Sequence, residues 1–332
     1  MSAAPDMAGR IVCFGEILLR LAAPPGRTLL QTPALDAGTS GAEANVAVSL
    51  ALLGHRAAMV SVLPDNPLGR AALDSLRAHG VDTSGIRLRP GRMGLYFLEP
   101  GAGARPADII YDRAGSAYAL ADPDLYDWPA LLDGAAWLHV SGIAPAIGDG
   151  PAHAVLAAMR AARERGVRVA FDGTPGAPWT ERAQDGAAVL LEVMRQADVL
   201  FAGPRDIALA LGRPELADPT RAAELARTAF AAFPNLTQLA WTVPVQHSAG
   251  EHELSAFLHT RTRAVTGGSY RLAGMVDRIG TGDAFAAGVL HGLQSGMAPA
   301  DVAGFALAAA ALKHGVTRDV VPERAGAYDA RR

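Results

Sequence analysis

Short apolar runs alternate with longer amphipathic segments along the chain. The apolar runs are a few residues long and mostly uninterrupted, which is typical of parallel strands that are buried on both faces. They are residues 11–15, 58–63, 137–140, 167–172, 198–202 and 238–243. We therefore expect these segments to form the strands of a parallel sheet.

The longer segments carry helix start and stop signals. Segment 151–166 begins with Pro151, which suits the first turn of a helix, and ends at Gly166, which suits its C-terminus. The other expected helices are residues 43–53, 68–79, 186–197, 220–233, 283–292 and 299–314. Because strands and helices alternate, the sequence predicts an α/β fold with a doubly wound, mostly parallel sheet and helices on both faces.

Two segments, 16–38 and 91–113, interrupt this alternation. Both contain strand-like pieces around Pro and Gly, with no helical pattern between them. We expect them to form a small antiparallel sheet beside the main one. Such a sheet would lie over the carboxyl edge of the parallel strands, where ligands bind in folds of this kind.

Composition narrows the classes of function. The formal charge of −3 and the lack of a basic block argue against a nucleic-acid partner, and no apolar run is long enough to span a membrane. The N-terminus lacks the apolar core of a signal peptide, and a single cysteine, Cys13, excludes an internal disulfide framework. We therefore expect a cytoplasmic protein without nucleic-acid or membrane partners.

The basic residues limit how the chain could bind phosphate. Of the 30 lysines and arginines, only Lys313 is a lysine. The dipeptide Gly-Lys is absent, which excludes a Walker A loop, and no predicted strand carries the lysine of a protein-kinase site. No GxGxxG follows a strand, which argues against a nicotinamide enzyme. A phosphate site must therefore use another device.

The strongest candidate is the stretch GTGD at 280–283, directly before a helix rich in Ala and Gly. Backbone N–H groups at a helix start favour bound anions, and glycine lets a phosphate approach them closely. Asp283 would face the same phosphate. That arrangement makes chemical sense if the carboxylate accepts the proton of a hydroxyl that attacks the phosphate. The alternative is that Asp283 only caps the helix.

Two other clusters could bind a ligand. Gly41 lies one helical turn before Asn45, so a ligand over that helix start could contact both; the alternative is an ordinary helix N-terminus. Tyr111 and Arg113, with Tyr96 earlier in the same segment, suit an acidic, hydroxylated ligand. A guanidinium group can bind a carboxylate with two hydrogen bonds. The alternative there is an exposed strand edge.

Taken together, these motifs resemble the PfkB (ribokinase-like) carbohydrate kinases and, among them, the 2-keto-3-deoxygluconate kinases. DRIGTGDAFAAG is similar to the family signature D-x-x-G-A-G-D-x-F-x-x-G. The subgroup resemblance rests on GEILLRLAAPPG, GAEANVAVSLALLG, LPDNPLGRAALDSLRAHGVDTSGI, GLYFLEPGAGARPADIIYDRAGSA and a C-terminal helix that ends in ALKHG. The similarity is dense over residues 10–145 and 274–320 and sparse between them.

The resemblance implies one ribokinase-like domain over residues 1–332, in which segments 16–38 and 91–113 form a β-sheet lid that pairs with a second lid in a homodimer. It also implies phosphorylation of a sugar or sugar-acid hydroxyl with ATP and Mg2+, with Asp283 as the general base. The amides of Gly280, Thr281 and Gly282 match the family's anion hole. The residues that match its sugar-acid site are Gly41, Asn45, Tyr96, Tyr111, Arg113 and Asp319.

The nucleotide side of the chain departs from the family pattern. GTPGAP at 173–178 follows Asp172, where the family has an Asn and an Arg. GPRD at 203–206 replaces Asn-x-x-Glu, which leaves Asp206 as the candidate carboxylate for the metal ion. VPVQHSAG at 243–250 replaces a polar stretch that contacts the nucleotide, and Ser40 replaces the first of two glycines in the substrate turn.

Three hypotheses about function remain open at this point. The leading one is a kinase that phosphorylates 2-keto-3-deoxygluconate or a similar sugar acid with ATP. The second is a catalytically weakened homologue that binds a sugar acid without efficient phosphorylation, as the lost Asn, Arg and Glu suggest. The third is a kinase of the same family that acts on fructose, ribose or a nucleoside, and the acid-suited Tyr111 and Arg113 argue against it.

Overall fold

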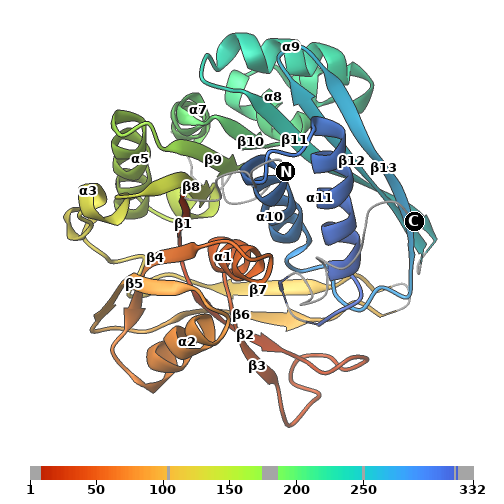
Figure 1. Ribbon diagram of the computed structural model, residues 1–332. Helices are drawn as coiled ribbons and strands as arrows, with labels where there is room; N and C mark the ends of the chain where they lie inside the picture. The colour runs from red at the N-terminus through yellow and green to blue at the C-terminus, as the bar shows by residue number, and fades with distance from the viewer. Residues whose placement is uncertain (1–8, 103–104, 174–185, 249–250, 318, 321–332) are drawn as a thin grey trace, which may run out of the picture.

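A sheet of nine strands forms the centre of the molecule (Figure 1). The computed structural model describes residues 9–102, 105–173, 186–248, 251–317 and 319–320. In spatial order the strands are β13 (Ala264–Ala273), β12 (Glu251–Thr260), β11 (Gln238–Ser248), β10 (Val199–Phe201), β9 (Arg168–Asp172), β8 (Ala135–Ser141), β1 (Arg10–Phe14), β4 (Ala57–Pro64) and β5 (Asp82–Arg89). Neighbours from β5 to β11 pair in parallel, and the hairpin of β12 and β13 adds antiparallel strands at one edge.

Helices cover both faces of this sheet, which confirms the predicted doubly wound architecture. On one face lie α3 (Trp128–Leu131), α4 (Ile143–Ala146), α5 (Asp149–Glu164), α7 (Gly186–Gln196), α8 (Pro204–Leu211) and α9 (Ala222–Ala232). On the other face lie α1 (Ala42–Leu52), α2 (Pro67–Ala78), α10 (Thr281–Gln294) and α11 (Pro299–Lys313). Short 3₁₀ helices occur at η1 (Pro123–Leu125), η2 (Pro214–Ala217) and η3 (Pro219–Arg221). Within the described ranges, no helix combines the length and the apolarity that crossing a bilayer requires.

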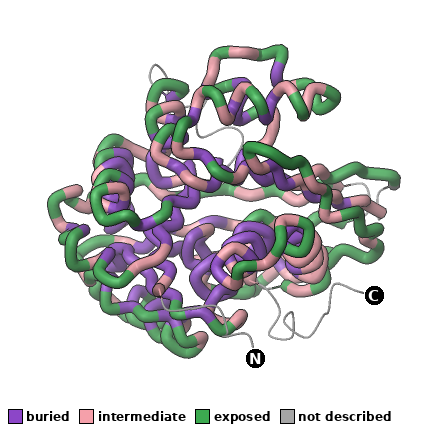
Figure 2. Tube along the Cα trace, turned by 45° about the horizontal axis from the view of Figure 1, so that its top comes forward, coloured by how far each residue is buried: buried purple, intermediate pink, exposed green. Residues whose placement is uncertain are grey.

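The parallel strands are apolar along their whole length because both of their faces are buried. Along β1, Val12 and Phe14 pack into one hydrophobic cluster, whereas Ile11 and Cys13 pack into a second cluster on the opposite face. Figure 2 shows the buried residues gathered between the layers and the exposed ones on the outside. The same two-sided burial explains why uninterrupted runs in the sequence could be recognised as strands.

All the strands and helices that the sequence predicted are present, with bounds that differ by a few residues. The sequence did not predict β5, β12 and β13, nor the short helices α3, α4 and α8. These three strands are polar or rich in glycine, and they lie toward the two ends of the sheet. There, pairing with a neighbouring strand outweighs the weak intrinsic preference of the segment.

A second sheet forms the lid, in the order β3 (Asp36–Ser40), β2 (Leu18–Ala22), β6 (Gly94–Glu99) and β7 (Asp108–Asp112). The expectation of a purely antiparallel sheet was wrong, because β2 and β6 pair in parallel. The reason is topological. Strand β2 follows β1 and β6 follows β5, and β1 and β5 run in the same direction within the main sheet, so the chain enters the lid twice in the same direction.

The lid packs against the segment that leads into α10. Leu18, Tyr96 and Leu98 of the lid form a small apolar cluster with Ile279. This cluster brings segment 16–38, segment 91–113 and the residue directly before the GTGD stretch together in space. The lid therefore lies against the segment that leads into α10.

Helices α10 and α11 approach closely because glycines line their contact. A Cβ atom on Gly288 would lie 2.6 Å from the Cα atom of Ala306, and one on Gly292 would lie 2.9 Å from a methyl carbon of Val302. Gly304 of α11, in contrast, has nothing within 4 Å of the position of a Cβ atom. The close contact therefore depends on particular glycines, and it fixes the helix whose N-terminus carries the GTGD stretch.

We expect Gly288→Ala to destabilise the fold and Gly304→Ala to stabilise it. The first substitution pushes the two helices apart, at a cost of about 1–3 kcal/mol. The second fills open space and reduces the conformational freedom of the unfolded chain, a gain of about 0.5–1 kcal/mol. Urea unfolding followed by circular dichroism measures both. Equal shifts of the two unfolding midpoints in the same direction would contradict the proposed helix contact.

Candidate active site

The GTGD stretch forms the start of α10. Gly280 is the N-cap residue with a left-handed backbone (φ 81°), and a Cβ atom there would lie 2.2 Å from the carbonyl oxygen of Asp319. Both facts require glycine. Gly282 has open space at the position of its missing Cβ atom, so an anion can approach the first amides of the helix. Of the three predicted amide donors, that of Thr281 already lies 3.3 Å from the carbonyl oxygen of Arg278.

Asp283 lies in the first turn of α10 and binds a side chain of another helix. The side-chain nitrogen of Asn45 on α1 donates to Oδ2 of Asp283 at 2.7 Å. Two predicted site residues, 238 positions apart, are thus in direct contact. A carboxylate that only capped α10 would not need a partner outside its own helix.

The surroundings of Asp283 make its carboxylate a stronger base. Burial raises the pKa of Asp283 well above its ordinary value, and the carboxylates of Asp172, Asp319 and Glu43 raise it further. The hydrogen bond from Asn45 acts in the opposite direction, because it stabilises the charged form. A carboxylate with a raised pKa is suited to accept a proton from a substrate hydroxyl.

Gly41 places Asn45 beside the lid. Its backbone has φ 143°, and a Cβ atom there would lie 2.4 Å from the carbonyl oxygen of Glu16, so no other residue fits. The carbonyl oxygen of Gly41 accepts a hydrogen bond from the amide of Asn45 at 2.7 Å, the first such bond of α1. The structural role of Gly41 is therefore to let α1 begin close to the chain that enters the lid.

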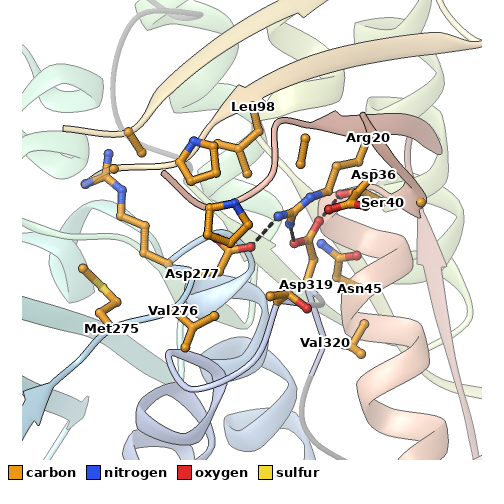
Figure 3. A pocket seen from close by; sticks show the side chains of 18 of the residues that line it. Arg20, Asp36, Ser40, Asn45, Leu98, Met275, Val276, Asp277, Asp319 and Val320 are labelled. Carbon is orange, nitrogen blue, oxygen red and sulfur yellow. Dashed lines mark hydrogen bonds and ion pairs between the residues drawn. The ribbon is translucent and has the colours of Figure 1, made fainter. Parts of the chain in front are cut away.

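A charged network joins the lid to the segment before α10 (Figure 3). Arg20 on β2 forms ion pairs with Asp277, at 2.5 Å between Nη2 and Oδ2, and with Asp319. Asp319 also accepts hydrogen bonds from the hydroxyl groups of Ser40, at 2.6 Å, and Tyr96, at 2.9 Å. The structure thus brings together the predicted residues Tyr96 and Asp319. Arg20 was not among the predicted site residues, although an arginine inside the otherwise apolar strand LLRLA is a recognisable signal.

A cavity of about 1060 Å³ opens beside this network. Its lining includes Arg20, Ser40, Asn45, Asp277 and Asp319, whose side chains Figure 3 shows around one space. The volume is ample for a small metabolite, since ligand pockets commonly measure about 300–1,000 Å³. Asn45, which lines the cavity, also donates to the carboxylate of Asp283, which is not itself among the lining residues.

Arg113 belongs to a neighbouring cluster under the lid. Its guanidinium lies over the ring of Tyr111, 4.5 Å from the centroid, and Nη1 lies 3.9 Å from Oε2 of the buried Glu16. The Tyr111 ring in turn lies 5.7 Å from the ring of Tyr96, which links this cluster to Asp319. Tyr111 is 55% exposed, as the strand-edge interpretation expected, whereas the side chain of Arg113 is only 13% exposed.

The contact between Arg113 and Glu16 is loose. Ser116 Oγ donates to Oε1 of Glu16 at 2.6 Å, but Glu16 Oε2 and Arg113 Nε have no hydrogen-bond partner among the described residues. Burial raises the pKa of Glu16, while Arg113 and Ser116 lower it. The Nε–H of Arg113 is therefore a buried donor without a partner among the described residues.

Comparison with known proteins identifies the family of the chain. Residues 8–322 match the model of the pfkB family carbohydrate kinases. The chain belongs to this family. The resemblance that the motifs predicted is confirmed, and family membership makes the chain a phosphotransferase with the ribokinase-like fold.

Similar proteins support this assignment, and two of the three named here align with more than nine tenths of the chain. A 2-dehydro-3-deoxygalactonokinase of Haloferax volcanii is 34% identical over 315 residues, which cover 95% of this chain and 93% of that protein. A 2-dehydro-3-deoxygluconokinase of Thermoproteus tenax is 31% identical over 61% of this chain and 62% of that protein. The crystal structure of a 2-dehydro-3-deoxygluconokinase from Thermotoga maritima is 37% identical, with a TM-score of 0.87 over 94% of this chain and 96% of that one.

The nucleotide side of this pfkB kinase lies partly outside the described residues, which leave out 174–185 and 249–250. Residues 243–248 belong to β11 and pair with β12, so the VPVQHS departure is a strand of the main sheet. Asp206 caps α8, because its Oδ2 accepts a hydrogen bond from the amide of Gly203 at 2.8 Å, and burial raises its pKa to about 6. In the part of the chain that the structure describes, no three His, Cys, Asp or Glu side chains group in a way that could hold a metal ion.

We expect Asn45→Ala to shift the pH dependence of catalysis by the kinase. A general base works only when it is deprotonated, so with Asp283 as the predicted base we expect kcat/KM to fall as the pH falls through its raised pKa. Removal of the Asn45 donor raises that pKa further, which moves the acidic limb to higher pH. Ser40→Ala is the control, because it removes a donor to Asp319 instead. An acidic limb that stays in place in Asn45→Ala would contradict the role of Asp283 as the titrating base.

Proposed function

We propose that the chain transfers the γ-phosphoryl group of ATP to a hydroxyl of 2-keto-3-deoxygluconate or a similar sugar acid. The observation that carries this proposal is the contact of Asn45 with Asp283, at the open, glycine-lined start of α10. A basic carboxylate next to a cluster of helix N-terminal amides is the arrangement that phosphoryl transfer to a hydroxyl requires.

In the proposed reaction, Asp283 is the general base. Asn45 occupies Oδ2, which leaves Oδ1 to accept the proton of the sugar hydroxyl. The hydroxyl oxygen bonds to the γ-phosphorus as ADP departs. The amides of Gly280, Thr281 and Gly282 form the proposed anion hole, in which the Gly282 position offers the most open approach. ATP supplies the phosphoryl group, and Mg2+ neutralises charge on its phosphates.

An acidic substrate fits the residues around the lid. Arg113 has an Nε–H without a partner among the described residues, and its pairing with Glu16 is long, so it can bind a carboxylate. Tyr96 and Asp319 offer a hydroxyl and a carboxylate to substrate hydroxyl groups, and Gly41 and Asn45 complete the proposed site on the side of α1. Tyr111 supports Arg113 through its ring. The two relatives named above act, by their names, on 2-keto-3-deoxy sugar acids that differ in configuration at one carbon.

For the metal ion, Asp206 remains the proposed carboxylate on the nucleotide side. One of its oxygens is engaged as a helix cap, so contact with Mg2+ through a bound water molecule suits it better than direct ligation. Magnesium commonly keeps several water ligands and binds few carboxylates of the protein. We place the reaction in the cytoplasm, which the single buried and unpaired Cys13 supports.

A catalytically weakened homologue is the second candidate. The cap contact of Asp206 favours it, because that carboxylate is not fully available to a metal ion. Calorimetry separates the two candidates: the weakened homologue binds a sugar acid but not ATP with magnesium, whereas the kinase binds both.

We expect both 2-keto-3-deoxygluconate and 2-keto-3-deoxygalactonate to be phosphorylated with a kcat/KM at least about 100-fold above that for fructose or ribose. Arg113→Gln should raise the KM for the acids about 10- to 100-fold, because a hydrogen bond to a charged group is lost, and should not affect the neutral sugars. Release of ADP in a coupled assay measures each rate. Arg165→Gln, on the exposed end of α5, is the control. Preference for a neutral sugar would show that the chain is a kinase of another substrate.

We also propose that two copies of the chain pair through their lids. Strand β7 lies at the open edge of the lid sheet, and Ile110 on it is 52% exposed. Open strand edges with apolar side chains are commonly covered by a partner. Ile110→Glu should convert a dimer into a monomer in light scattering after gel filtration, whereas Leu68→Glu on α2, where the leucine is 51% exposed, should not. A wild-type chain that is monomeric at micromolar concentration would overturn this proposal.

A further inference from the structure

Lys313 is the last residue of α11 and the only lysine of the chain. Its side chain is fully buried. A buried ammonium group is costly unless it is paired, and burial lowers the pKa of Lys313 accordingly. All the other basic residues of the chain are arginines. The single lysine, whose ammonium group is more compact than a guanidinium group, lies inside the fold.

The ammonium group joins two backbone segments that meet at the active site. Nζ donates to the carbonyl oxygen of Asp277 at 3.1 Å and to that of Val316 at 3.0 Å. The first bond holds Asp277, three residues before the turn at Gly280, and the second holds Val316, three residues before Asp319. Gly280 packs directly against the backbone of Asp319, so the two segments must be held in register for the turn to keep its shape.

Other contacts fix the same segment but bring no positive charge to it. The amide of Val276 donates to the carbonyl oxygen of His314 at 2.8 Å, and the amide of Ile279 donates to the carboxylate of Asp277 at 2.9 Å. These bonds define the path of the chain toward α10. They cannot offset the negative charge that gathers around the turn, whereas an ammonium group can.

The charge of Lys313 faces a group of carboxylates. Asp277, Asp319 and Asp283 each favour its protonated form, and Arg20 disfavours it. Arg20 binds the side chains of Asp277 and Asp319 from the lid, while Lys313 binds the backbone of Asp277 from the end of α11. The two cations therefore act on the same group of carboxylates from different elements, Arg20 by ion pairs and Lys313 through its charge.

We propose that Lys313 is a positioning residue for phosphoryl transfer, which holds the turn at 277–282 in its anion-binding shape and offsets the carboxylates around it. This inference rests on the proposed function, since it assumes that the turn receives a phosphate. Lys313 does not line the cavity, as far as the described residues show, and it acts through the turn.

The test uses chemical rescue of the full-length enzyme. Lys313→Ala removes three methylene groups and the ammonium group, which together correspond to propylammonium. We expect kcat to fall about 100-fold, as for a small displacement of catalytic groups, with a smaller change in the KM for the sugar acid. Added propylammonium should raise the kcat of Lys313→Ala about tenfold, and the effect should saturate with its concentration, because propylammonium returns the hydrogen-bond donors and the positive charge. Propanol, which has no positive charge, should not raise it.

Lys313→Met, which keeps the volume without the charge, is the matched variant. It should fold as the wild type does by circular dichroism and remain about as slow as Lys313→Ala. A wild-type rate in Lys313→Met, or equal rescue by propanol and propylammonium, would overturn the proposal. Failure of both variants to fold would also overturn it, because Lys313 would then be only a structural residue.

The proposed function fails separately if the wild type phosphorylates no sugar acid. In that case the same variants are compared by calorimetric binding of ADP with magnesium. The proposal predicts weaker binding in both variants and partial recovery of Lys313→Ala with propylammonium. Unchanged binding in both variants would contradict it.

Discussion

The crowding of carboxylates at the start of α10 is the constraint on which the site depends. Asp172, Asp319 and Glu43 all act on the charge of Asp283, and Asp277 lies at the entry to the same turn. Like charges at this density repel unless cations or protons offset them. The lid supplies Arg20, and the end of α11 supplies the buried ammonium group. The fold thus places two cations beside the carboxylates at the start of α10, and their positive charge reduces the repulsion between these carboxylates.

This balance connects the architecture with the chemistry. The glycine contact of α10 with α11 fixes the helix start, and the lid is tied to that start by ion pairs and by the cluster around Ile279. Burial, and after it the neighbouring carboxylates, keep the pKa of Asp283 high, which favours proton transfer to it. The excess of carboxylates suits a site in which phosphates arrive together with a divalent cation. The lid thus contributes a positive charge, that of Arg20, to the carboxylates of the site.

Local sequence patterns predicted the main sheet and the two helix starts of the site. The parallel strands could be recognised because two-sided burial makes them continuously apolar, and the helix starts with Asn45 and Asp283 could be recognised because glycine and polar residues gather at such ends. Asn45 was predicted to bind the substrate and Asp283 to act as the general base. Their direct contact was not predicted, since it depends on how α1 and α10 meet.

The parts that could not be predicted depend on distant contacts. Arg20 and Asp319 are 299 positions apart, and nothing in either segment indicates the other. The parallel pairing of β2 and β6 follows from the direction of two strands in another sheet. Arg113 was predicted to share one site with Asp319, and the structure places it against Glu16, with the rings of Tyr96 and Tyr111 between the two groups.

The most direct test of the account follows the labelled γ-phosphoryl group from ATP to 2-keto-3-deoxygluconate in the wild type and in Asp283→Asn. The account predicts a labelled sugar-acid phosphate from the wild type. It also predicts a rate at least about 100-fold lower in the variant, with both substrates still bound by calorimetry. Equal rates in the two proteins, or a wild type that binds the sugar acid and never labels it, would contradict the account.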